Sequence, residues 1–135
     1  MKFRNGFVSN SSSSSFVVAF PKDLHLVNLK ELLFGDAEHL TAYNDPFSTE
    51  ELANQIRKDI EAQTPNHVPE DRGNDWEYDN NYPIYDTELV KSMIREHPDK
   101  DIYVFEYRDE DGAFYSTLEH GDVFKNLPHR RESHH

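Results

Sequence analysis

Two short runs with the apolar pattern of buried strands lie near opposite ends of the chain. The first covers residues 16–20, where every consecutive position is apolar. Because a strand points successive side chains to opposite faces, an unbroken apolar run predicts a central strand that is covered on both faces. The second run, residues 102–107, precedes the turn-like sequence Glu110-Asp111-Gly112. We expect residues 113–118 to return from this turn as a hairpin partner.

Three segments between these runs have helical periodicity. Their predicted N-caps are Asn28, Ser48 and Asp86, and a glycine or proline follows each segment. The first two caps precede a glutamate by three residues, which is capping-box spacing. The sequence therefore predicts an α+β fold. We expect a small mixed or antiparallel sheet, made of strand 16–20 and the C-terminal hairpin 102–118, with three helices packed on one of its faces.

The length of 135 residues is that of one domain, so we expect residues 1–135 to form a single unit. Three segments of it lack a strong apolar pattern: a Ser-rich N-terminal segment (1–15), a long aromatic and acidic loop (64–85) and a His/Arg-rich tail (126–135). Serine is small, and its hydroxyl competes for backbone hydrogen bonds. The serine run is therefore expected to be a polar loop at one end of the sheet.

Residues 4–16 carry the motif Arg-Asn-Gly-Phe-Val-Ser-Asn followed by five serines and a phenylalanine. This motif resembles the opening of a group of small uncharacterised proteins from tailed bacteriophages and some bacteria. The resemblance covers residues 1–20, and the closing segment 127–135 is similar as well. It implies that the chain is phage-related. It implies no activity and no functional residue, because none is established for that group.

Composition and charge exclude several classes of function. The chain has no cysteine, which excludes disulfides, thiolate nucleophiles and cysteine-ligated zinc. Its net charge of −12 repels nucleic-acid phosphates and anionic lipids, and it favours a partner protein with a basic surface. No apolar run approaches the roughly 20 residues that span a bilayer, and no signal-peptide pattern is present. We expect a cytoplasmic protein, in the host cytoplasm if it is phage-encoded.

The loop 64–85 is the longest aperiodic stretch, and it interleaves aromatic residues with acids. The aromatic residues that we expect to bind a partner are Trp76, Tyr78, Tyr82 and Tyr85. Rigid aromatic side chains anchor protein interfaces, and acids around them would steer a basic partner. The alternative is that these rings hold the loop against its own domain.

A second group of candidates lies near the C-terminus. If the tail folds back, His120, Asp122, His129 and His134 could hold a divalent metal through nitrogen and carboxylate oxygen. Against this, no pair of histidines has the i, i+4 spacing of helical metal ligands, and His134 lies at a chain end that usually frays. The alternative is that all of them are surface side chains.

The serine run offers a third candidate, a weak anion site. Backbone amides and hydroxyls of Ser11, Ser12 and Ser13, together with the guanidinium of Arg4, could cradle a phosphate. However, no nucleophile elbow or phosphate-binding loop motif surrounds the serines. A plain polar loop is the alternative.

These patterns together predict a small acidic accessory protein that acts by binding another protein and needs no cofactor. The alternative from another class is a metal-dependent hydrolase or nucleotide-processing enzyme, with His120, Asp122, His129 and His134 as its catalytic and metal-binding residues. The sequence predicts no oligomeric state.

Overall fold

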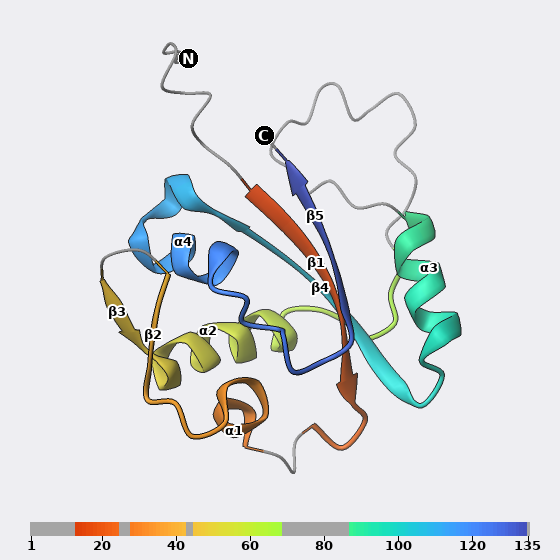
Figure 1. Cartoon of the computed structure of the whole chain (residues 1–135). Coiled ribbons are helices and arrows are strands. Elements are labelled where there is room, and N and C mark those ends of the chain that lie inside the picture. The colour runs from red at the N-terminus through yellow and green to blue at the C-terminus, as the bar shows by residue number, and fades with distance from the viewer. Residues whose placement is uncertain (1–12, 25–27, 43–44, 69–86, 135) are drawn as a thin grey trace.

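The computed structural model describes residues 13–24, 28–42, 45–68 and 87–134. It confirms the α+β class, with four α-helices and two antiparallel sheets among these residues. The larger sheet has the strand order β4-β1-β5 (Figure 1). Its central strand β1 (Ser13–Pro21) is antiparallel both to β4 (Lys100–Arg108) and to β5 (His129–His134). The prediction that residues 16–20 form a buried central strand is therefore confirmed.

Helices cover both faces of this sheet. On one side lie α1 (Leu29–Phe34), α2 (Thr49–Glu61) and α4 (Ala113–His120), and on the other side lies α3 (Thr87–Glu96) (Figure 1). The β1 side chains divide accordingly: Phe16, Val18 and Phe20 face the first group, and Val17 and Ala19 face α3. The expectation that all helices pack on one face is wrong, because an apolar run without alternation needs cover on both faces.

The first two helices begin at their predicted caps. The side chain of Asn28 accepts a hydrogen bond from the backbone N–H of Glu31 at 3.3 Å. The hydroxyl of Ser48 accepts from the N–H groups of Glu50 and Glu51 at 3.1 and 3.4 Å. These bonds satisfy donors that have no partner within the helix. The predicted cap of α3, residue 86, lies outside the described residues.

The predicted hairpin 102–118 is correct in its first strand and wrong in its second. After β4 the chain makes a short 3-10 helix, η4 (Asp109–Asp111), and then forms helix α4. Gly112 separates the two helices. Its φ of +119° is a backbone conformation that residues other than glycine rarely adopt. Within α4, the hydroxyl of Thr117 donates to the carbonyl of Ala113 at 2.9 Å. The turn sequence therefore starts a helix instead of reversing the strand.

The outer edge of β4 is already occupied, which also excludes a hairpin partner there. The side-chain amide of Gln63 donates to the carbonyl of Val104 at 2.8 Å and accepts from its N–H at 2.9 Å. Asn66 pairs in the same way with Ile102, its backbone N–H donating at 2.8 Å and its side-chain oxygen accepting at 2.9 Å. The first residues of the predicted loop 64–85 are thus fixed on the sheet, and they protect its edge.

The described end of the serine run and most of the tail join the sheet, contrary to the prediction of a polar loop and a separate tail. Ser13 to Ser15 belong to β1, and the side chains of Ser14 and Ser15 are buried. The tail supplies β5, and the turn before it inserts Phe124, whose ring centroid lies 4.9 Å from that of Phe105. Serine is tolerated in β1 because strands on both sides satisfy its backbone groups.

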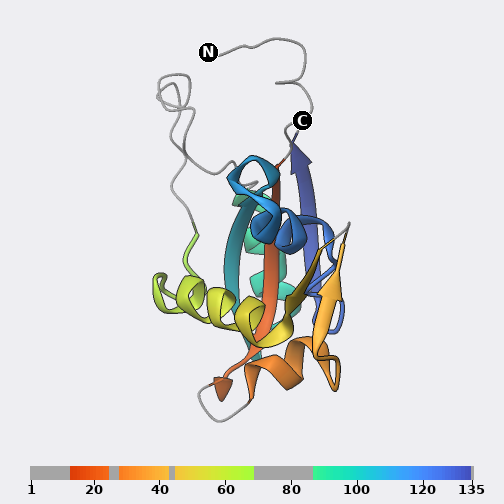
Figure 2. The same cartoon turned by 90° about the vertical axis from the view of Figure 1, so that its left-hand side faces the viewer.

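A second, two-stranded sheet lies beside the start of α2. It pairs β2 (His39–Thr41) with β3 (Pro46–Ser48), as Figure 2 shows from the side. The backbone N–H and the hydroxyl of Thr49 donate to the carbonyls of Glu38 and Ala37 at 3.0 and 2.7 Å. These bonds attach the small sheet to the first turn of α2. Across the described ranges, no helix is both long enough and apolar enough to cross a membrane.

We expect Ser48→Ala to lower the free energy of unfolding by about 1 kcal/mol, because it removes the cap of α2. Urea denaturation of the two proteins measures this difference. Asn54→Ala is the control, since Asn54 is exposed within the same helix and has no capping role. If both variants are as stable as the wild type, the cap contributes nothing.

Candidate functional site

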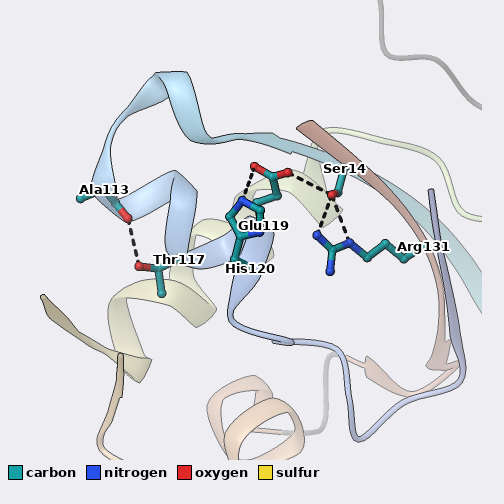
Figure 3. Close-up of polar contacts among 6 residues, drawn as sticks. All are labelled: Ser14, Ala113, Thr117, Glu119, His120 and Arg131. Atoms are coloured by element: carbon teal, nitrogen blue, oxygen red, sulfur yellow. Dashed lines mark hydrogen bonds and ion pairs between the residues drawn. The ribbon is translucent and has the colours of Figure 1, made fainter. Parts of the chain in front are cut away.

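A buried carboxylate lies where β1 begins and α4 ends. The side chain of Glu119 has no exposed surface. Its Oε2 accepts a hydrogen bond from the hydroxyl of Ser14 at 3.1 Å, and its Oε1 lies 3.2 Å from Nε2 of His120 (Figure 3). Burying a carboxylate is costly unless hydrogen bonds or charges compensate it. Ser14 supplies a hydrogen bond to one carboxylate oxygen, and the imidazole of His120 lies beside the other.

Arg131 of β5 extends this network to the other edge of the sheet. Its Nε and Nη2 groups both donate to the hydroxyl oxygen of Ser14, at 3.1 and 2.9 Å (Figure 3). The guanidinium carbon also lies 5.6 Å from the centroid of the Phe16 ring, within the range of a cation–π contact. Ser14 therefore accepts from Arg131 while it donates to Glu119, and it links the cation to the buried carboxylate.

A glycine closes the helix that carries Glu119 and His120. The N–H of Gly121 donates to the carbonyl of Thr117 at 2.8 Å and ends α4 directly after His120. A Cβ atom at Gly121 would lie 2.5 Å from that carbonyl oxygen and 2.8 Å from a methyl carbon of Leu40. Only glycine therefore fits, and this close turn fixes the end of α4 that bears both side chains.

Asp109 belongs to the same cluster. One ligand atom from each of Asp109, Glu119 and His120 lies within 4.8 Å of the others, and this is the only such group of three found among the described residues. Of the predicted metal ligands, only His120 is part of it. Asp122 is exposed, and the ring of His129 lies 2.9 Å from the carbonyl of Leu127. Neither Asp122 nor His129 is in the group with His120, and the His134 side chain lies outside the described residues.

The cluster differs from a nucleophilic triad in the order of its groups. A serine nucleophile needs a base beside it and a third group that orients the base. Here Glu119 stands between Ser14 and His120, and Ser14 has no exposed surface from which it could reach a substrate. The arrangement positions a carboxylate rather than activating a serine.

A cavity of about 350 Å³ opens beside the edge of β4. At its wall the phenol of Tyr107 donates to Oδ2 of Asp59 at 2.6 Å, and Gln55 donates to the other carboxylate oxygen at 3.1 Å. Burial, and secondarily the charge of Asp59, raises the pKa of Tyr107 well above the usual value of a phenol. The side chains of Tyr107, Asp59 and Gln55 therefore form hydrogen bonds with one another. The phenol of Tyr107 stays protonated at neutral pH.

Six exposed carboxylates lie on α1, around the small sheet and in the first turn of α2. We call this group the acidic face: Glu31, Asp36, Glu38, Asp45, Glu50 and Glu51. Between residues 28 and 56 the only lysine or arginine is Lys30. The charges of this face are therefore poorly balanced by basic neighbours in the sequence.

Several predicted site residues cannot be placed. The aromatic candidates Trp76, Tyr78, Tyr82 and Tyr85 lie outside the described residues. The same holds for Arg4, Ser11 and Ser12 of the predicted anion site. Ser13 is described, and it pairs with Arg108 and His134 as the first residue of β1.

Comparison with known proteins identifies no relative: no family model, no curated protein and no solved structure matches the chain.

The raised pKa of Tyr107 predicts a loss of stability at alkaline pH. Below about pH 10 the phenol is protonated in both the folded and the unfolded chain, so it adds no pH dependence. Above that pH the unfolded chain loses this proton more readily, and the free energy of unfolding should fall. Tyr107→Phe should make the fall shallower in urea titrations at a series of alkaline pH values. If the free energy of unfolding of Tyr107→Phe falls with pH as steeply as that of the wild type, the raised pKa of Tyr107 is contradicted.

Proposed function

We propose that the chain is a small acidic accessory protein of the cytoplasm that acts by binding a partner protein with a basic surface. The observation that supports this best is the acidic face. It carries six exposed carboxylates on a chain whose net charge is −12. Long-range attraction between complementary surfaces raises the association rate and selects basic partners.

The acids of this face are available to a partner. In the part of the chain that the structure describes, none of the six takes part in an ion pair. Glu50 and Glu51 have a structural role as well, because acids in the first turn stabilise a helix through its dipole. Asp36, Glu38 and Asp45 lie outside the helices. The proposal therefore depends mainly on these three.

The loop 64–85 is proposed to supply the anchoring contacts of the same complex. The first residues of this loop are attached to the core: Asn66 pairs with β4, and Val68 packs against the hydrophobic cluster on the α3 side of the sheet. The aromatic residues further along belong to the types that dominate binding energy at protein interfaces. In this proposal the acids steer the partner, and Trp76 anchors it.

The metal-dependent hydrolase is the weaker candidate. Among the described residues, Asp122 and His129 are not part of the group of possible metal ligands that contains His120. No reaction is proposed for the chain.

Charge reversal on the acidic face should weaken partner binding more than charge reversal elsewhere. We expect the triple variant Asp36→Lys/Glu38→Lys/Asp45→Lys to lower the association rate at low salt by tenfold or more, because it reverses the steering field. The partner is first recovered from a cell lysate with the wild-type chain and identified by mass spectrometry. Surface plasmon resonance then compares the variants at several salt concentrations.

The matched control is Glu61→Lys/Asp99→Lys/Glu110→Lys, which alters three exposed acids outside the face. Both triple variants change the net charge by the same amount, so any difference between them reports the position of the charges. Equal association rates for the two variants would refute the acidic face as the binding surface.

We expect Trp76→Ala to weaken binding of the same partner by about 2 kcal/mol, or roughly thirtyfold, as for an interface hot spot. Its melting temperature should stay close to that of the wild type, because an interface anchor does not hold the core together. Titration calorimetry and a thermal melt give the two values. A large loss of stability with unchanged affinity would place Trp76 in the core and remove the loop from the proposed interface.

A further inference from the structure

The cluster at the end of α4 contains ligand types that bind metals, contributed by two separate elements. Asp109 begins η4 directly after β4, while Glu119 and His120 end α4. Helix α4 packs against both η4 and β4, which brings these segments together (Figure 1). We propose that Asp109, Glu119 and His120 bind one divalent transition-metal ion, Zn²⁺ or Mn²⁺.

The distances within the cluster suit a single ion. Ligand atoms bonded to one Zn²⁺ at about 2.0–2.2 Å lie roughly 3.0–3.5 Å from their neighbours. Oε1 of Glu119 lies 3.2 Å from Nε2 of His120, within that range. The third ligand atom, from Asp109, is within 4.8 Å of both. The Asp109 side chain is half-buried, and binding of one ion would draw its carboxylate towards the other two ligand atoms.

Groups behind the cluster hold the central ligand in place. Ser14 donates to Oε2 of Glu119, which leaves Oε1 directed at His120 (Figure 3). Arg131 in turn fixes Ser14 through two hydrogen bonds. Metal-binding carboxylates are commonly oriented in this way by partners that do not touch the ion. Ser14 and Arg131 are therefore positioning residues for this site.

The burial of the ligands indicates an ion bound at the margin of the core. Glu119 is fully buried, whereas Asp109 and His120 are partly exposed. Three ligands leave at least one coordination position for water, or for a group from another molecule. An ion here would also reduce the repulsion between the carboxylates of Asp109 and Glu119.

The ligand set restricts which ion fits. It combines one imidazole nitrogen with carboxylate oxygens, and the chain has no cysteine to supply a thiolate. Imidazole suits transition metals such as zinc, while carboxylates also suit manganese. The competing interpretation is that His120 and Glu119 form a hydrogen bond or ion pair and bind no metal. The site is independent of the proposed partner binding, because its ligands are not part of the acidic face.

Titration of chelator-treated protein without an affinity tag tests the site. The whole chain should carry His134→Gln and His135→Gln in every sample, which removes adventitious binding at the chain end. Calorimetry with zinc chloride is expected to show one ion per chain. Asp109→Asn and His120→Gln should each weaken binding at least tenfold. His120→Gln is the sharper variant, because glutamine can still donate a hydrogen bond to Glu119 but offers no imidazole nitrogen.

His129→Gln is the matched control, since His129 belongs to the predicted set but not to the cluster, and it should bind zinc as the parent does. Ser14→Ala should weaken binding roughly 10–100-fold, as expected for loss of a group that orients a ligand. Thermal melts without metal confirm that each variant is folded. Manganese chloride should broaden the amide NMR signals of residues 109, 119 and 120 first. Absence of binding by the parent protein, or equal binding by His120→Gln, would overturn the proposal.

Discussion

The fold depends on one constraint: strand β1 is hydrogen-bonded along both edges and covered on both faces. Its partners are β4 and β5, and its side chains enter two separate hydrophobic clusters. A strand in this position must have its backbone polar groups paired, because water cannot reach them. Both neighbours are therefore required, including β5 from the far end of the chain. The terminal segment is structural and not an appendage.

The same constraint explains why a serine run can open the central strand. Ser14 and Ser15 are buried, and a buried hydroxyl needs partners of its own. Ser14 obtains them from Glu119 of α4 and Arg131 of β5. A single hydroxyl thus connects three elements that are far apart in the sequence. The same serine donates a hydrogen bond to the carboxylate of Glu119, which lies beside Asp109 and His120.

Several features that depend on local sequence were predicted, although helix α4 and the two-stranded sheet of β2 and β3 were not. The caps Asn28 and Ser48 and the first strand of the supposed hairpin were all predicted, since each is set by residues a few positions apart. The strand β5 was missed because its sequence, His-Arg-Arg-Glu-Ser-His, has no apolar alternation. It is held by backbone pairing with β1, and backbone pairing leaves no compositional signal.

The candidate site, too, was predictable from the sequence only in part. His120 was singled out from the sequence, but its expected neighbours were Asp122 and the tail residues His129 and His134. The register of β1 with β5 instead places His129 opposite Val18, while Arg131 lies opposite Phe16 and close to Ser14. Ser14 and Glu119 are 105 positions apart. The two residues meet only in the folded chain. A serine run and a distant Glu-His pair do not predict this contact from the sequence.

The edges of the sheet bear on how the chain can bind a partner. Gln63 and Asn66 occupy β4 backbone groups that an added strand would need. Among the β5 side chains that the structure describes, those of Arg130 and Arg131 are exposed, and charged residues on an edge strand disfavour pairing with another chain. Recognition by strand addition requires a free edge with unpaired backbone groups. In the described parts of the larger sheet, these features disfavour the addition of a strand. For the proposed partner binding they favour recognition through side chains, such as the exposed carboxylates of the acidic face.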